Sequence, residues 1–411
     1  MNKLKYVIIG NSAAGIGAIE GLRQNDQHGE ITIISQECHH TYSRPLISYL
    51  LCDKTTVENM KYRDDDFYVK NRVTLLSGMR VTNINAQDHT VTLHDGSYIP
   101  YDKLLVATGS SPFIPSFDGL DTVTNPFTFM SLDDAQAIKK AITRTSKVLI
   151  VGAGLIGLKC AEGISKWTNS CSVDLSARIL SSILDEEGSE IVKKHLEENG
   201  VSFALSRSVR CFEQNKAILD NGDVIAFDIL VLAVGVRPNT GLLEHIAKVE
   251  KGIVINTKME TTCPSIYAAG DCTQSVDISS GQEKIMALLP NAYLQGECAG
   301  INMAGGKQKF DKAIPMNAIG FFGLHVITAG NYNGDVYSES DGQTYKKLFY
   351  SKNRLNGYIL IGDVQKAGIY TSLIREQTPL DSIDFPLLCK KPGLMAFTKN
   401  ERNLKLGGGV K

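Results

Sequence analysis

The sequence predicts an α/β protein with two Rossmann-like domains and a small α+β domain at its C-terminal end. Three observations lead to this fold class. A pattern of strand, glycine-rich turn and helix occurs twice, once at the start of the chain and once near residue 150. Each copy is followed by a hairpin signal and then by a second apolar strand. The residues from about 311 onward have strand and helix patterns of their own.

Both glycine-rich turns directly follow an apolar strand. In the first copy, an apolar run at residues 6–9 leads into GNSAAG at residues 10–15, and a helical pattern continues beyond it. In the second copy, a run at residues 148–151 leads into GAGLIG at residues 152–157, again before a helical pattern. This context is the one that the dinucleotide-binding fingerprint requires.

Each glycine of the fingerprint has its own physical reason. The first permits a tight turn, the second lets a pyrophosphate approach the backbone, and the third lets the helix pack on the strand. The pyrophosphate then lies on free N–H groups at the positive end of the helix. Ser12 replaces the second glycine in the first copy, whereas the second copy matches fully.

An acidic residue follows the next strand in each copy. Glu37 comes shortly after the strand at residues 31–34, although Gln36 beside it is a second candidate for the ribose contact. Asp174 lies about 20 residues beyond the second turn, where a carboxylate accepts hydrogen bonds from ribose hydroxyls and repels a 2′-phosphate. The second copy is therefore expected to prefer NAD to NADP, with Arg178 nearby working against that preference.

The duplication continues further along the chain. Asp-Gly at residues 95–96 and Asn-Gly at residues 221–222 predict hairpin turns. Apolar strands ending at Gly109 and Gly235 follow them. Between the copies, a capping box beginning at Ser131 predicts the start of a helix. Two fingerprints in parallel frameworks are much stronger evidence than one.

Composition and charge exclude several classes of protein. The 411 residues carry 43 Lys and Arg against 44 Asp and Glu, a formal net charge of −1. This balance argues against a nucleic-acid binder and a polybasic membrane protein. No apolar run approaches the roughly 18 residues that cross a bilayer, and a strand begins too early for a signal peptide. A cytoplasmic protein that binds neither nucleic acid nor membrane is expected.

The cysteines do not indicate a metal site. No two of the nine cysteines are separated by two residues, so the sequence lacks zinc-ribbon, iron–sulfur and dithiol-redox signatures. His39 and His40 are adjacent, but solvated loop histidines explain them more simply than metal ligands. No bound metal is predicted.

A third motif completes a family resemblance. Residues 266–271 (IYAAGD) end in Gly270 and Asp271. With the two fingerprints, they resemble the two-dinucleotide-binding flavoproteins of the pyridine nucleotide–disulfide oxidoreductase superfamily. Within it, the sequence is most similar to NADH:rubredoxin oxidoreductases and the flavoprotein domain of assimilatory nitrite reductases. This likeness includes YSRPL at residues 42–46, GLIGLK at 154–159, GVRPN at 235–239 and the segment 315–330.

The resemblance implies two cofactors, FAD on the first fold and NADH on the second, and a set of residues for each. The residues expected to bind FAD are Gly10, Ser12, Ala14, Gly15, Glu37, Arg44, Pro45, Val81, Ala107, Thr108, Gly109, Gly270 and Asp271. The residues expected to bind NADH are Gly152, Gly154, Leu155, Ile156, Gly157, Asp174 and Gly235.

The resemblance also implies a domain organisation. A discontinuous FAD domain would span residues 1–112 and 244–310, with the NAD domain at 113–243 and a C-terminal interface domain at 311–411. Relatives use that last domain for dimer or partner contacts, so a homodimer or a hetero-oligomer is expected. Inside it, residues 345–350 and 357–361 predict a hairpin, followed by a helix over about 366–375.

Lys159 is the one candidate catalytic side chain. It lies two residues after Gly157, near the start of a helix whose dipole disfavours a cation. Many relatives carry Glu at this position, close to the junction of nicotinamide and flavin. A Lys there would stabilise negative charge on reduced flavin or orient the nicotinamide. A stem packed on apolar neighbours with a solvated ammonium would explain it equally well.

These features predict an FAD-dependent NADH oxidoreductase. Hydride would pass from NADH to flavin, and electrons would continue to a rubredoxin, a ferredoxin or an iron–sulfur subunit. One alternative is a Cys52-dependent NADH oxidase, peroxidase or disulfide reductase, although the resemblance places Tyr49 rather than Cys52 nearest the flavin. Another is a flavoprotein electron-transfer subunit of a larger complex.

Overall fold

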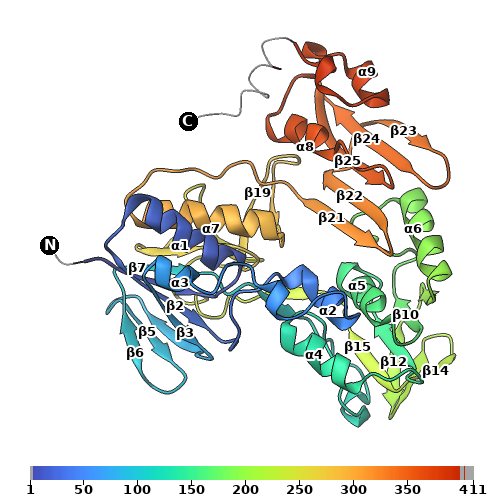
Figure 1. Ribbon diagram of the computed structural model, residues 1–411, viewed down its shortest axis with the longest axis horizontal. Coiled ribbons are helices and arrows are strands. Elements are labelled where there is room, and N and C mark those ends of the chain that lie inside the picture. The colour runs from blue at the N-terminus through green and yellow to red at the C-terminus, as the bar shows by residue number, and fades with distance from the viewer. Residues whose placement is uncertain (1–2, 399–401, 403–411) are drawn as a thin grey trace. The chain divides into compact units, whose positions relative to one another are not determined.

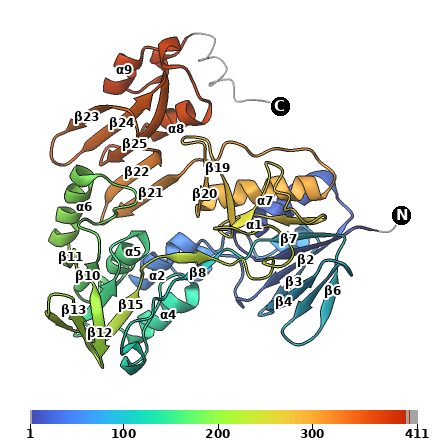
Figure 2. The same ribbon diagram turned by 180° about the vertical axis from the view of Figure 1, so that it is seen from behind.

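The computed structural model describes residues 3–398 and 402, and these residues form two compact units. The first unit contains the chain up to Ala177, together with Gly200–Val276 and Glu283–Asp311. The second contains Arg178–Asn199, Asp277–Gln282 and the chain from Lys312 onward. Figures 1 and 2 show the elements of both units from opposite sides.

A five-stranded parallel sheet organises the first glycine turn. Its strands, in spatial order, are β18 (Ile266–Ala268), β7 (Lys103–Val106), β1 (Lys5–Ile9), β2 (Glu30–Ser35) and β3 (Val73–Ser77). All four neighbouring pairs are parallel. Taken along the chain, this is the strand order of a Rossmann half, with β1 at the point where the order reverses.

Two helices cover one face of this sheet and lie side by side in Figures 1 and 2: α1 (Ala13–Asn25) and α7 (Leu289–Met303). Glycines bring their backbones together. A Cβ on Gly17 would lie 2.3 Å from the Tyr293 carbonyl oxygen, and one on Gly296 would lie 2.0 Å from that of Ala14. The start of α1, which carries the first glycine turn, is therefore fixed by a helix almost 300 residues later in the chain.

A four-stranded parallel sheet repeats this arrangement around the second turn. Its strands, in spatial order, are β11 (Val201–Leu205), β10 (Ser170–Asp174), β9 (Val148–Val151) and β15 (Ile229–Leu232). Helix α5 (Leu155–Ile164) follows the turn, and α4 (Leu132–Ala141) precedes β9. The capping box predicted at Ser131 is present, with the Ser131 side chain accepting a hydrogen bond from the Asp134 amide.

Small antiparallel sheets complete the first unit. One contains β4 (Val81–Asn85), β5 (Thr90–Leu93) and β6 (Tyr98–Pro100), and another contains β12 (Val209–Glu213), β13 (Lys216–Leu219) and β14 (Val224–Ala226). Both predicted hairpin turns are confirmed, at Gly96 between β5 and β6 and at Gly222 between β13 and β14. Strands β8 (Ser110–Pro112) and β16 (Val236–Pro238) pair with each other, so the segments that follow the two apolar strands are joined.

Shorter elements of the first unit connect these sheets. They are α2 (Ile47–Leu51), α3 (Phe67–Lys70), the 3-10 turns η1 (Arg44–Leu46), η2 (Glu58–Met60) and η3 (Leu120–Thr122), and the strand β17 (Ile253–Val254). Strand β17 pairs with β19 (Thr273–Asp277), which is followed by β20 (Gln282–Ile285).

The second unit is built on an antiparallel sheet. Its strands, in spatial order, are β21 (Met316–Phe321), β22 (Leu324–Gly330), β25 (Arg354–Ile361), β24 (Tyr345–Ser351) and β23 (Asp335–Ser340). Its later helices and turns are α8 (Ala367–Arg375), η4 (Leu380–Ser382), α9 (Phe385–Lys390) and η5 (Leu394–Ala396). The predicted hairpin and the helix after it are confirmed, and so is the predicted fold class as a whole.

Helix α6 (Glu186–Glu198) belongs to this second unit, although it lies between β10 and β11 in the chain. Asp185, its N-cap, accepts hydrogen bonds from the Tyr345 hydroxyl at 2.7 Å and from Lys347 Nζ at 2.6 Å. The three-domain boundaries stay a prediction, and the last residues of the C-terminal domain lie outside the described part.

Candidate functional site

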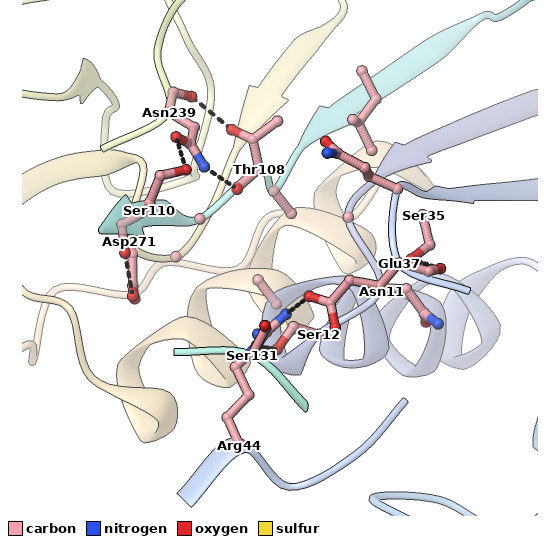
Figure 3. A pocket seen from close by; sticks show the side chains of 18 of the residues that line it. Asn11, Ser12, Ser35, Glu37, Arg44, Thr108, Ser110, Ser131, Asn239 and Asp271 are labelled. Atoms are coloured by element: carbon pink, nitrogen blue, oxygen red, sulfur yellow. Dashed lines mark hydrogen bonds and ion pairs between the residues drawn. The ribbon is translucent and has the colours of Figure 1, made fainter. Parts of the chain in front are cut away.

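A cavity of about 680 Å³ lies at the carboxyl ends of the first parallel sheet. Gly10 follows β1, Glu37 follows β2, Ala107 follows β7 and Gly270 follows β18, and all four line the cavity. In open α/β sheets, ligands bind in this crevice, next to the strand at which the order reverses. Figure 3 shows Thr108, Asn239 and Asp271 on one side of the cavity and Glu37 and Arg44 on the other.

The first glycine turn forms one wall of the cavity. Gly10 has φ +115°, and a Cβ there would lie 2.1 Å from the Ala107 carbonyl oxygen. A Cβ on Gly15 would lie 2.1 Å from the carbonyl oxygen of Gly10. Helix α1 then begins beside the cavity, and no side chain caps its N-terminus. Its first amides and the helix dipole suit a phosphate group.

Arg44 brings a positive charge to the same wall. Its guanidinium forms an ion pair with Glu37 and donates to the Tyr42 hydroxyl at 3.1 Å and to Ser12 Oγ at 3.4 Å. Tyr42 in turn donates to Glu37 at 2.7 Å. Burial alone would lower the pKa of Arg44, but Tyr42 and Glu37 outweigh it and raise that pKa. The cavity therefore holds a permanent cation.

The opposite end of the cavity contains the half-buried carboxyl group of Asp271. Asp271 lies 3.3 Å from the Ser110 hydroxyl, and burial raises its pKa against the opposing effects of Ser110 and Arg44. Close by, Thr108 and Asn239 exchange hydrogen bonds of 2.7 and 2.9 Å. Figure 3 shows Asn239 and Asp271 on the same side of the cavity.

Two polar atoms in the cavity wall lack a hydrogen-bond partner. The Tyr68 hydroxyl donates to Asn11 Oδ1 at 2.7 Å, but Asn11 Nδ2 is buried and has no partner among the described residues. His40 Nε2 is in the same state, and both residues line the cavity. Neither atom is accessible to solvent, so neither faces the open cavity. The helix start, the cation and the polar side chains that line the cavity fit the diphosphate and hydroxyl groups of FAD.

Most residues expected to bind FAD meet in this cavity. The predicted residues that line it are Gly10, Ser12, Ala14, Glu37, Arg44, Val81, Ala107, Thr108, Gly109, Gly270 and Asp271. Gly15 and Pro45, the other two predicted residues, do not line the cavity. Gly15 packs against Gly10, and Pro45 follows Arg44 in η1. Sequence reasoning missed Asn11, Tyr42 and Asn239. The GVRPN motif contains Asn239, but only the pairing of β8 with β16 brings it to Thr108.

The second glycine turn has the same backbone geometry. Gly152 has φ +116°, and a Cβ there would lie 2.3 Å from the Ala233 carbonyl oxygen. A Cβ on Gly157 would lie 2.1 Å from the carbonyl oxygen of Gly152. In contrast, no atom comes within 4 Å of a Cβ built on Gly154 or Gly235. These two glycines leave open space, which is what a closely approaching pyrophosphate needs.

Asp174 lies directly beside this second turn. One carboxylate oxygen accepts a hydrogen bond from the Ala153 amide at 2.6 Å, and the other accepts one from the Ser176 amide at 2.7 Å. Two backbone donors thus fix the carboxylate at the edge of the turn. Each carboxylate oxygen can accept a further bond, so Asp174 can still receive a ribose hydroxyl. Leu155 and Ile156, the other two predicted NADH contacts, form the first positions of α5.

Lys159 and Cys52 do not line the cavity. Lys159, on α5, forms an ion pair with Glu162. Cys52 is 8% exposed, and its sulfur lies 3.5 Å from the Tyr49 carbonyl oxygen. A reactive thiol needs an accessible site, and this geometry does not provide one.

Neither a metal site nor a membrane span is found among residues 3–398 and 402. No group of three or more His, Cys, Asp or Glu side chains in that part of the chain could hold a metal ion. His39 instead pairs with Asp133 at 2.7 Å. The helices described there are all too short or too polar to cross a bilayer.

Two family models match this chain. Residues 4–296 match pyridine nucleotide-disulphide oxidoreductases, and residues 315–378 match the C-terminal domain of rubredoxin NAD+ reductase. The first match covers both glycine turns and the whole cavity. The second lies within the antiparallel unit.

Individual relatives span nearly the whole chain. The epsilon subunit of the NADH-dependent phenylglyoxylate dehydrogenase of Aromatoleum evansii is 31% identical, with 92% of each chain covered. The assimilatory nitrate reductase electron transfer subunit of Bacillus subtilis is 30% identical over 92% of this chain, which spans 50% of that relative's length. The solved NADH:rubredoxin oxidoreductase of Clostridium acetobutylicum is 26% identical, with a TM-score of 0.77 over 93% of this chain and 98% of that one.

Proposed function

Because the chain belongs to the pyridine nucleotide-disulphide oxidoreductase family, whose members bind FAD and NADH, we propose that its first glycine turn holds FAD and its second holds NADH. The chain is an NADH-dependent oxidoreductase that transfers electrons through flavin to a small redox protein. We propose in addition which residues bind FAD and NADH and which class of protein accepts the electrons. The cavity beside Gly10 carries this proposal, because it combines a helix start, a cation and polar lining side chains.

The chain's own residues bind and orient the two cofactors. Bound FAD would accept the hydride of NADH and release its electrons singly. Arg44 would balance the charge of the FAD diphosphate, and Asp271 and Asn239 would receive the polar groups at the far end of the cavity. The turn at residues 152–157 would bind the NADH diphosphate through backbone amides, with Asp174 on the ribose. We also assign residues 1–112 and 244–310 to FAD, 113–243 to NADH and 311–411 to partner contacts.

The proposed acceptor is an iron–sulfur or rubredoxin-type protein. The cysteine spacing of this sequence has no cluster motif, so the one-electron carrier must be another molecule. The match of residues 315–378 to the C-terminal domain of rubredoxin NAD+ reductase supports this class of acceptor. We place the reaction in the cytoplasm, with dimer or partner contacts through the antiparallel unit.

An anaerobic titration with NADH, followed by addition of oxidised rubredoxin or a ferredoxin, tests the proposal. We expect the flavin absorbance to bleach after one equivalent of NADH, without a thiolate-to-flavin charge-transfer band, and to recover when the iron protein is added. Flavin that stays oxidised would refute the assignment of the NADH site. Flavin that bleaches but reduces no iron protein would refute the acceptor alone.

A second candidate function is that of an electron-transfer subunit in a larger complex. It is favoured by the similarity over 92% of both chains to a subunit of a multi-subunit dehydrogenase. Purification from the native source, with identification of bound proteins by mass spectrometry, separates the two possibilities. A stoichiometric iron–sulfur partner would favour the subunit, and a lone flavoprotein would favour the free reductase.

The Cys52-dependent oxidase, peroxidase or disulfide reductase has no support from the geometry of Cys52. We expect Cys52→Ser to retain NADH-dependent flavin reduction and acceptor turnover within about twofold, because the thiol lies buried at the end of α2. A loss of most turnover in this variant, at unchanged flavin content, would bring the alternative back.

A further inference from the structure

Tyr42 lies in the wall of the cavity, although the sequence did not predict it among the residues that bind FAD. Its side chain is buried, with 9% of the residue exposed. Its hydroxyl contacts three groups: the Glu37 carboxylate at 2.7 Å, the Arg44 guanidinium at 3.1 Å and the Leu132 backbone amide at 3.0 Å. Tyr42 therefore touches two residues expected to bind FAD and also the first residue of α4.

The donor and acceptor in each of these bonds follow from chemistry. A guanidinium and a backbone amide can only donate, so Arg44 and Leu132 both donate to the Tyr42 oxygen. The single proton of the hydroxyl is then left for Glu37, which accepts it. Burial raises the pKa of Tyr42, so the hydroxyl keeps this proton. The direction of the bond from Tyr42 to Glu37 is therefore fixed.

The Glu37 carboxylate is held on both of its oxygens. One accepts the bond from Tyr42, and the other forms the ion pair with Arg44. Each oxygen can still accept a further bond. Asp174 has the corresponding place after β10, where two backbone amides hold its carboxylate. In the first fold, two side chains hold the acid that backbone amides hold in the second.

The neighbouring Gln36 also lines the cavity but is not held in this way. It is exposed, and its side chain has no hydrogen bond within the described part of the chain. A side chain that is already fixed loses less conformational entropy when a ligand binds. Of the two candidates for the ribose contact, Glu37 is therefore the one prepared for it.

We propose that Tyr42 is a positioning residue, whose hydroxyl holds Glu37 in the orientation that receives the adenosine ribose of FAD. The inference rests on the proposed function, in which FAD occupies this cavity. A ribose hydroxyl that donates to a carboxylate forms a charge-assisted bond. If the carboxylate can rotate, part of that gain is lost in ordering it. Without the Tyr42 hydroxyl, one Glu37 oxygen is no longer held.

The test compares FAD with an analogue whose adenosine lacks both ribose hydroxyls. Equilibrium dialysis of the flavin-depleted full chain gives a Kd for each, and their ratio measures the contribution of the hydroxyls alone. The parent should bind FAD about 30-fold more tightly than the analogue, because the lost bonds have a charged acceptor. Tyr42→Phe should reduce this ratio to less than about fivefold.

Tyr68→Phe is the matched control. Tyr68 is buried to a similar extent, with 7% exposed, and its hydroxyl also donates to a cavity residue at 2.7 Å, but that residue is Asn11 instead of Glu37. This variant should weaken FAD and the analogue by the same factor and keep the parent's ratio. A ratio that falls as far as in Tyr42→Phe would show that any lost buried hydroxyl has this effect, and would contradict us.

A Tyr42 that only ties α4 to the cavity wall makes a different prediction. Tyr42→Phe would then lower the thermal midpoint and weaken both ligands equally, and this result would overturn the proposal, as would a parent without any preference for FAD. If Tyr42→Phe does not fold, Glu37→Gln should lower the ratio to a similar value, and an unchanged ratio would contradict us. A chain that binds neither flavin would refute the proposed function itself, whereas equal binding of both would refute this inference alone.

Discussion

The first glycine turn, at residues 10–15, and the second, at residues 152–157, have nearly the same backbone. Their leading glycines have φ of +115° and +116°, and in both a Cβ would collide with a carbonyl oxygen of a neighbouring strand segment. Their surroundings differ. The first turn is part of a cavity that also contains Arg44, Asp271 and the start of α4. In the second turn, Gly154 faces open space at the position where the first turn carries Ser12.

This difference shows how one motif can serve two kinds of ligand. A cavity with a built-in cation suits a cofactor that stays bound, because its departure would leave Arg44 and Asp271 without the polar groups of that cofactor. An open site whose acidic residue is already fixed by backbone amides suits a co-substrate that must leave in every cycle. If the first turn holds a bound cofactor and the second an exchanging co-substrate, substitutions at the two turns should have different effects, the largest of which comes first.

Matched alanine substitutions should separate the two turns most strongly. Gly10→Ala places a Cβ 2.1 Å from a carbonyl oxygen and should reduce flavin content to less than about a tenth of the parent's. Gly152→Ala should keep its flavin but weaken NADH binding by about 100-fold, or roughly 2.7 kcal/mol. Flavin-to-protein absorbance ratios and stopped-flow reduction provide the two readouts. If both variants lost the same property, the division of ligands would be wrong.

Arg44→Gln should weaken the first site alone. The substitution leaves Glu37 without its cation and removes a charged contact for the FAD diphosphate. Hydrogen bonds to charged groups contribute about 1.5–3 kcal/mol, so the Kd for FAD should rise by about 10- to 100-fold. Equilibrium dialysis of flavin measures it. Arg207→Gln, beside the second sheet, is the control and should leave flavin binding unchanged.

Asp174→Ala should weaken the second site alone, and by less. It removes the acceptor of the Ala153 and Ser176 amides and the expected ribose contact. We expect KM for NADH to rise by about tenfold and the preference for NADH over NADPH to shrink, at unchanged flavin content. Steady-state kinetics with both nucleotides measure this. Asp174→Asn keeps an acceptor for only one of the two amides, so a milder loss than in Asp174→Ala would assign part of the effect to these hydrogen bonds, and equal damage would assign it to the lost charge.

The smallest effect concerns the pH dependence of the flavin-depleted protein. Burial raises the pKa of Asp271, so the folded chain holds this proton more tightly than the unfolded chain does. The associated stability is fully present below the unfolded pKa and is lost as the pH rises through the folded pKa. Asp271→Asn should remove this decline. Thermal midpoints measured between about pH 3.5 and 7 test it, and identical slopes in both proteins would contradict it.

Local constraints explain what could be predicted from the sequence. The positive φ of Gly10 and Gly152 is a local backbone property that glycine adopts at no steric cost, so the fingerprint predicts both turns. The hairpins at Gly96 and Gly222 were predictable for the same reason. The two parallel sheets then follow from repeating strand, turn and helix.

Long-range contacts explain what could not be predicted. Asn239 reaches Thr108 only because β8 pairs with β16, and Tyr42 accepts from the Leu132 amide across 90 residues of chain. Neither contact has a local sequence signal. The same holds for the contact between Lys159 Nζ and the Tyr49 ring. The fingerprint locates the lysine, but only the packing of α2 on α5 brings the ring within 5.0 Å of it.

Helix α6 has a consequence for how the protein is made. Asp185 at its start is bonded to Tyr345, 160 residues further along the chain. Because ribosomes add about 5–20 residues per second, α6 emerges roughly 10–30 s before the strand that receives it. Four of the five strands of the first parallel sheet are translated before α6, but α6 must wait, unsupported, until about 150 further residues have been added. Such late closure is slow and exposes apolar surface, so this interval is the stage of synthesis at which chaperones are most needed.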